Sequence, residues 1–87
     1  MDLIFPNHSR SYDVTRDAVR FWGYESSIEW SFFVTVAALR RVYPDLGQDK
    51  ASFLGAFDAN RDLIFETAAK VFVRGRKGSY ELVAADF

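Results

Sequence analysis

Two segments in the first half of the chain place hydrophobic side chains at every second position. They are residues 18–22 and residues 28–34, and the five residues that separate them include Gly23. Two alternating segments joined by a short glycine-containing connection are typical of an antiparallel hairpin, with its turn over residues 23–27. The alternation places Trp22 and Phe33 on the hairpin face opposite to the core positions.

Two later segments repeat hydrophobic residues at the spacing of a helix. Residues 36–43 follow Thr35, a helix-capping residue type, and stop at Pro44. The second pattern starts after Asp49, another capping type, and runs from residue 50 to residue 74. Its main stripe has the spacing 3, 4, 3, 4, 3 and is made of Leu54, Phe57, Arg61, Ile64, Ala68 and Val71.

The second predicted helix is long for so short a chain. A single helix over residues 50–74 measures about 37 Å at 1.5 Å per residue. A globule of this chain length has a radius of gyration near 12 Å, hence a diameter of roughly 30 Å. The helix must therefore kink, overhang the globule or pack against a second copy, and Gly55 is the expected weak point.

A third alternating segment, residues 79–83, predicts a final strand, and residues 12–14 predict a short early one. The element order is then β-β-β-α-α-β. This order favours an α+β two-layer sandwich, with an antiparallel sheet and both helices packed on one face. With 87 residues and no repeat, the chain is expected to form one domain over residues 1–87.

The composition supports a rich core and excludes several chemistries. Hydrophobic residues make up 49% of the chain and aromatic residues 17%, which lets a short chain bury enough area to fold. The chain has no cysteine, so it has neither a disulfide framework nor a thiolate metal site. The net charge of −1 argues against a dedicated nucleic-acid binder. No hydrophobic run reaches the length of a membrane span and Met1-Asp2-Leu3 does not open a signal peptide, so we expect a soluble cytoplasmic protein.

Four motifs spread along the chain resemble the bacterial family catalogued as domain of unknown function 1488. They are Tyr12-Asp13, Ala18-Val19-Arg20-Phe21-Trp22-Gly23, Phe57-Asp58-Ala59-Asn60-Arg61-Asp62 and Gly75-Arg76-Lys77-Gly78-Ser79-Tyr80. The resemblance runs from Phe5 to Phe87. It implies a small α+β fold with a curved antiparallel sheet and two helices. It implies no activity, no catalytic residue and no cofactor.

Arg61 is unusual because it occupies a position in a hydrophobic stripe. A buried guanidinium needs a partner, since an isolated buried charge is very costly. One interpretation is a structural ion pair with Asp58, Asp13 or Asp17. The other is an anion-binding arginine in a cleft, which a closed ion pair with one of these aspartates would exclude.

The densest basic cluster lies at the end of the second predicted helix. Cations suit the C-terminal end of a helix, and glycine is the common residue just beyond it, which explains Arg74 and Gly75 structurally. The alternative is a weak nucleic-acid site, in which cations meet phosphates and an aromatic ring stacks on a base. The residues of that site are Lys70, Arg74, Arg76, Lys77 and Tyr80.

Four large aromatic residues, Trp22, Phe33, Phe65 and Phe72, are expected to fall outside the main core. Exposed aromatic groups in a soluble protein mark an interface, and a broad core is the alternative. Together with the long helix, they favour a homo-oligomer, most simply a dimer.

The sequence contains no arrangement that predicts catalysis. His8 is the single histidine and has no carboxylates at ligand spacing, so no metal site is expected. There is no phosphate loop and no dinucleotide motif, so no cofactor is expected. The leading hypothesis is a non-enzymatic, self-associating module that also binds an unknown protein partner or stabilises an assembly. Weak nucleic-acid binding through residues 70–80 is the alternative.

Overall fold

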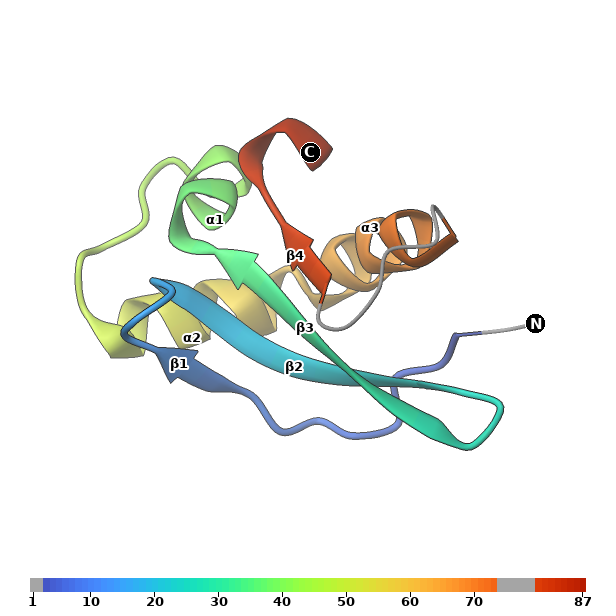
Figure 1. Cartoon of the computed structure of the whole chain (residues 1–87). Helices are drawn as coiled ribbons and strands as arrows, with labels where there is room; N and C mark the ends of the chain where they lie inside the picture. The colour runs from blue at the N-terminus through green and yellow to red at the C-terminus, as the bar shows by residue number, and fades with distance from the viewer. Residues whose placement is uncertain (1–2, 74–79) are drawn as a thin grey trace.

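The computed structural model of the chain describes residues 3–73 and 80–87. Its centre is a four-stranded sheet with the order β1-β2-β3-β4 (Figure 1). The strands are β1 (Ser11–Asp13), β2 (Ala18–Glu25), β3 (Ile28–Thr35) and β4 (Tyr80–Leu82). The predicted hairpin is confirmed, because β2 and β3 pair antiparallel over their whole length.

The turn of this hairpin is shorter than the sequence indicated. Gly23 lies within β2, opposite Trp30, and not in the turn. The chain reverses at Ser26 and Ser27 alone, with φ angles of 54° and 67°. Two consecutive residues with positive φ twist the turn in the direction that matches paired strands, so both strands extend further than predicted.

Both predicted helix caps form as expected. Helix α1 (Val36–Val42) begins after Thr35, whose hydroxyl accepts a hydrogen bond from the backbone N of Ala38 at 3.1 Å. Helix α2 (Lys50–Ala59) begins after Asp49, whose carboxylate accepts one from the backbone N of Ser52 at 2.8 Å. These bonds satisfy backbone N–H groups that a helix leaves unpaired at its start.

The long predicted helix is interrupted, as its length allowed, but the break lies at Asn60 and not at Gly55, which lies inside α2. The two parts are α2 and α3 (Arg61–Val73). Asn60 has a non-helical backbone, with φ −124° and ψ 23°. Its side-chain amide donates to the carbonyl of Ala56 at 2.8 Å, so it competes with the backbone for that acceptor. The division lets α2 contact β1 and β2 while α3 contacts β4, which one straight helix could not do.

The last strand departs from the predicted antiparallel sheet. β4 pairs with β3 in parallel, with Phe32 opposite Tyr80 and Val34 opposite Leu82. Three helices connect these two strands, and a connection of that length allows the chain to re-enter the sheet in the same direction. The sheet is therefore mixed, and a short 3-10 helix, η1 (Ala84–Asp86), follows it.

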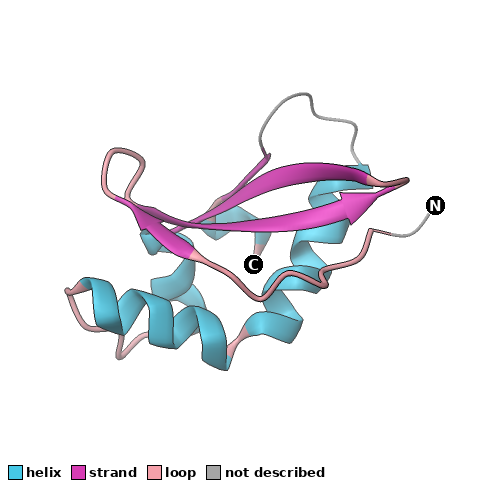
Figure 2. Cartoon of the chain, turned by 90° about the horizontal axis from the view of Figure 1, so that it is seen from below, coloured by secondary structure: helices cyan, strands magenta, loops and turns pink. Residues whose placement is uncertain are grey.

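All three α-helices lie on one face of the sheet (Figure 2). The fully buried side chains between the layers are Val19, Phe21, Phe32, Val34, Leu39, Phe57, Ile64, Val71 and Leu82. The Cα radius of gyration is 12.1 Å. The α+β fold is thus confirmed, with three helices instead of two.

Candidate functional site

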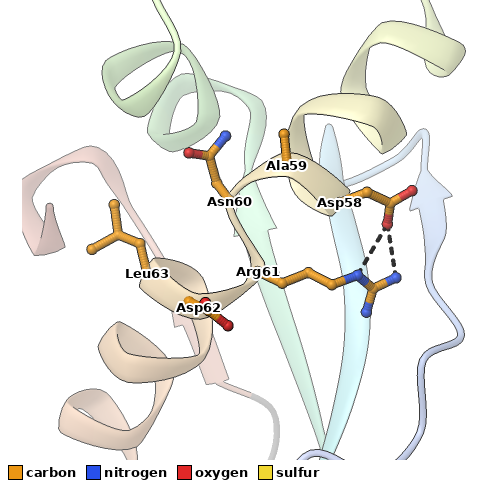
Figure 3. A pocket seen from close by; sticks show the side chains of 6 residues that line it. All are labelled: Asp58, Ala59, Asn60, Arg61, Asp62 and Leu63. Carbon is orange, nitrogen blue, oxygen red and sulfur yellow. Dashed lines mark hydrogen bonds and ion pairs between the residues drawn. The ribbon is translucent and has the colours of Figure 1, made fainter.

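Arg61 begins α3 and turns its side chain back towards the end of α2 (Figure 3). Its Nη2 lies 2.7 Å from Oδ1 of Asp58, and its Nε lies 3.2 Å from the same oxygen. Nη2 also donates to the backbone carbonyl of His8 at 2.9 Å. The guanidinium carbon lies 4.9 Å from the ring centroid of Phe57. Arg61 therefore packs on the core and holds the N-terminal segment at the same time.

Asp58 accepts hydrogen bonds from a second arginine as well. Arg10 donates from Nε to Oδ1 at 3.0 Å and from Nη2 to Oδ2 at 2.8 Å, a two-pronged arrangement. The hydrogen bonds from Arg10, followed by those from Arg61, lower the pKa of the Asp58 carboxyl. The same contact raises the pKa of Arg10. We call Arg10, Asp58 and Arg61 the arginine–aspartate network.

A shallow hollow of about 410 Å³ opens at the division between α2 and α3, lined by residues 58–63. It offers no free guanidinium, since Arg61 is held by Asp58 and by the His8 carbonyl. The remaining nitrogen of Arg61, Nη1, is buried and therefore not exposed to a ligand in the hollow. The ion-pair interpretation of Arg61 is correct, with Asp58 as the partner. The closed pair excludes the anion-binding cleft.

The aromatic residue of the predicted nucleic-acid site, Tyr80, lies in the core and not at the surface. Tyr80 is only 3% exposed, and its ring packs against Phe32, Trp30 and Phe72 in the core. A ring buried in this way cannot stack on a base. Lys70 is exposed near the end of α3, while Arg74, Arg76 and Lys77 lie outside the described residues.

Two of the four aromatic residues expected outside the core are in fact packed against it. Phe65 stacks on Phe5 with ring centroids 4.3 Å apart and planes 1° apart. Phe72 lies edge-on to Trp30 at 5.5 Å. The expectation was wrong for Phe65 and Phe72 because the division at Asn60 and the N-terminal segment supply neighbours that a single straight helix does not have.

Trp22 and Phe33 do lie on the other side of the sheet, opposite the helices. We call this surface the outer face. The strand registers assign to it Ser11, Asp13, Ala18, Arg20, Trp22, Tyr24, Glu29, Ser31, Phe33, Thr35 and Glu81. No helix within the described residues covers it (Figure 2).

Two arginines organise the outer face. The guanidinium of Arg16 lies 4.2 Å from the ring centroid of Phe33, and that of Arg20 lies 5.7 Å from it. Arg20 is also 5.1 Å from the ring of Trp22 and donates to Oγ of Ser31 at 3.0 Å. Phe33 is only 4% exposed beneath these groups. The face thus presents cations that lie on aromatic rings and largely cover Phe33, an arrangement that attracts carboxylates.

Two features are absent from the described part of the chain, a metal-binding cluster of side chains and a membrane-spanning helix. In residues 3–73 and 80–87, no three histidine or carboxylate side chains lie close enough to hold a metal ion. Within the same ranges, no helix has the length and hydrophobic character needed to cross a membrane.

The family model for the protein of unknown function (DUF1488) matches residues 3–83. The chain belongs to the DUF1488 family. A crystal structure of a DUF1488 protein of unknown function from Shewanella loihica PV-4 has the same fold. Its TM-score is 0.83 at 18% identity, over 94% of each chain. No curated protein matches this DUF1488 chain at a significant level.

Arg16 and Arg20 of the outer face were not among the candidate residues that the sequence indicated. The alternation of β2 was enough to place Arg20 on the side of Trp22. Arg16 could not be placed, because it reaches Phe33 from the turn between β1 and β2, where no periodicity applies. Arg10 was missed for the same reason, since its pairing with Asp58 depends on how a loop crosses the helices.

Proposed function

We propose that this DUF1488 protein is a non-enzymatic interaction module that self-associates through the outer face of its sheet. The observation that carries the proposal is the cluster of Trp22, Phe33, Arg16 and Arg20 on a face that no described helix covers. Aromatic residues and arginines are the types enriched at the centres of protein interfaces. The cytoplasmic location expected from the sequence stays a prediction.

The size of the outer face sets the expected strength of the association. β2 and β3 have eight residues each and measure about 26 Å, while β1 and β4 have three residues each and measure about 10 Å. At a strand spacing of about 4.8 Å, the face is thus about 350 Å² in projection, below the roughly 800 Å² per partner that standard interfaces bury. We therefore expect a reversible dimer with a Kd in the micromolar range.

Nucleic-acid binding is not supported by the described residues. The outer face carries the carboxylates Asp13, Glu29 and Glu81 against the guanidiniums Arg16 and Arg20, so it has no cationic excess. The ring that the alternative needed, Tyr80, is buried.

Sedimentation velocity over a range of concentrations tests self-association. The wild type is expected to shift from monomer to dimer mass as its concentration rises. Trp22→Glu should weaken dimerisation by at least about tenfold, because it places a charge at the centre of the face. Leu63→Glu is the matched control, since Leu63 is 43% exposed on α3 and remote from the outer face.

The variants should keep the circular dichroism spectrum of the wild type. A wild type that stays monomeric throughout the concentration range contradicts the proposal. So does a Trp22→Glu variant that is folded and dimerises as well as Leu63→Glu.

A further inference from the structure

Three residues on neighbouring strands form a row across the outer face. Arg20 on β2 is opposite Phe33 on β3, and Phe33 is opposite Glu81 on β4. Residues in register share a face of the sheet, so all three project to the outer side. Glu81 is exposed while its neighbours Tyr80 and Leu82 are buried, which agrees with this direction. Adjacent strands are about 4.8 Å apart, so the backbones of Arg20 and Glu81 lie about 10 Å apart with Phe33 between them.

Nη2 of Arg20 donates to Oγ of Ser31 at 3.0 Å. Its Nε is buried, so only the terminal nitrogens of the guanidinium can meet a partner. A guanidinium has five N–H donors and binds carboxylates best. Neither Arg20 nor Glu81 forms an ion pair within residues 3–73 and 80–87. The row therefore carries a cation and an anion that the chain does not pair with each other.

Two-fold symmetry brings these charges together between two copies. The two-fold axis runs parallel to β3, in the plane between two outer faces that face each other. Rotation by half a turn about this axis leaves each residue at the same position along the strand direction. It places β4 of one copy opposite β2 of the other. Phe33 then lies near the axis, and Arg20 of each copy faces Glu81 of the other. Two sheets that pack face to face keep their strands within about 30° of each other, which preserves this match. Such an interface uses the same surface on both copies, as closed dimers do.

We propose that a second copy of this chain docks on the outer face in this arrangement, with two symmetric Arg20–Glu81 ion pairs on either side of Phe33. This assignment rests on the proposed function and specifies its partner and geometry. Arg16 also lies near the axis, and Asp13, 3.9 Å away, offsets its charge there. The near balance of cations and carboxylates on the face favours a second copy over a polyanion.

Charge exchange between copies tests the pairing. Arg20→Glu and Glu81→Arg should each weaken dimerisation by at least about tenfold, because each places like charges opposite each other. An equimolar mixture of the two variants should dimerise like the wild type. In the mixed dimer, the carboxylate introduced at position 20 of one variant faces the guanidinium introduced at position 81 of the other. The unchanged Glu81 of the first variant faces the unchanged Arg20 of the second, so both ion pairs are restored.

Glu66→Arg is the control for the change in net charge in Glu81→Arg, because Glu66 is exposed on α3. Circular dichroism confirms that each variant is folded. A wild type that dimerises while the mixture fails to regain dimers overturns the two-fold arrangement and leaves self-association standing. A monomeric wild type overturns both. A monomeric wild type that binds poly-glutamate or a single-stranded oligonucleotide through Arg20 would assign the face to a polyanion instead.

Discussion

Gly23 is the position at which the core tolerates no side chain. A Cβ atom there would lie 2.8 Å from Cε1 of Phe5, 3.0 Å from Cε1 of Phe32 and 3.1 Å from Cδ1 of Leu3. We expect Gly23→Ala to lower the free energy of unfolding by about 1–3 kcal/mol, because a packed core must move to accept the methyl group. Urea denaturation of the purified protein measures this change.

Gly55 provides the matched control for the same substitution. It lies inside α2, and a Cβ atom there would meet nothing within 4 Å. Gly55→Ala should raise the free energy of unfolding by roughly 0.5–1 kcal/mol, through the better helix propensity of alanine. Equal effects of the two substitutions would show that Gly23 is not a close-packing position.

At the scale of single residues, the sequence predicted the helix caps but not the turn or the loop contacts. The side chains of Thr35 and Asp49 accept hydrogen bonds from backbone N–H groups three residues further along the chain. Their capping role can therefore be predicted from the local sequence. Ser26 and Ser27 adopt positive φ without the glycine or asparagine that usually marks such a turn. The glycine of this region, Gly23, serves packing instead, which only the neighbouring chain segments reveal.

At the scale of elements, the arginine–aspartate network fastens the N-terminal segment to the division between α2 and α3. Its stability contribution depends on the charge of Asp58. Because the folded state lowers the pKa of Asp58, the contribution is complete above the unfolded pKa of about 4 and is lost as the pH falls through the folded pKa. Acid should therefore release this contact before it affects the hydrophobic core.

Asp58→Asn should remove the network at neutral pH. We expect a loss of about 1 kcal/mol in the free energy of unfolding, a modest value because the three side chains are partly exposed to solvent. The difference from the wild type should shrink as the pH is lowered below about 4, where the wild type loses the same carboxylate. Urea denaturation at a series of pH values measures both effects.

Glu66→Gln is the control for this series, since it removes one exposed carboxylate from α3 without touching the network. It should change stability little at any pH. An Asp58→Asn variant that behaves like Glu66→Gln at neutral pH would show that the network contributes nothing measurable.

The division at Asn60 illustrates why element boundaries escaped the sequence pattern. The helical spacing of hydrophobic residues continues across Asn60 without interruption. The reason is that Phe57 before it and Ile64 after it are both buried in the core. The local departure is confined to one residue. Arg61 in the stripe was the available signal, since its guanidinium lies against Phe57 and turns back to bind Asp58 at the end of α2.

At the scale of the whole molecule, alternation and helical spacing were sufficient to predict the α+β class and the covered face of the sheet. They could not give the direction of β4, because Tyr80 and Leu82 bury the same side chains in a parallel or an antiparallel pairing. The sequence pattern also could not predict the outer face as one continuous surface. This face combines all four strands, and β4 comes from the far end of the chain.

Self-association through that face should make thermal stability depend on protein concentration, because dimerisation stabilises only the folded state. For a Kd in the micromolar range, raising the concentration from about 2 μM to about 200 μM should add on the order of 1–2 kcal/mol. In a domain of this size that corresponds to an increase in Tm of roughly 5–10 °C. Differential scanning calorimetry of the wild type and Trp22→Glu compares the two directly. The Tm of the variant should rise less with concentration than that of the wild type, and a wild-type Tm that stays constant would contradict dimerisation of the folded chain.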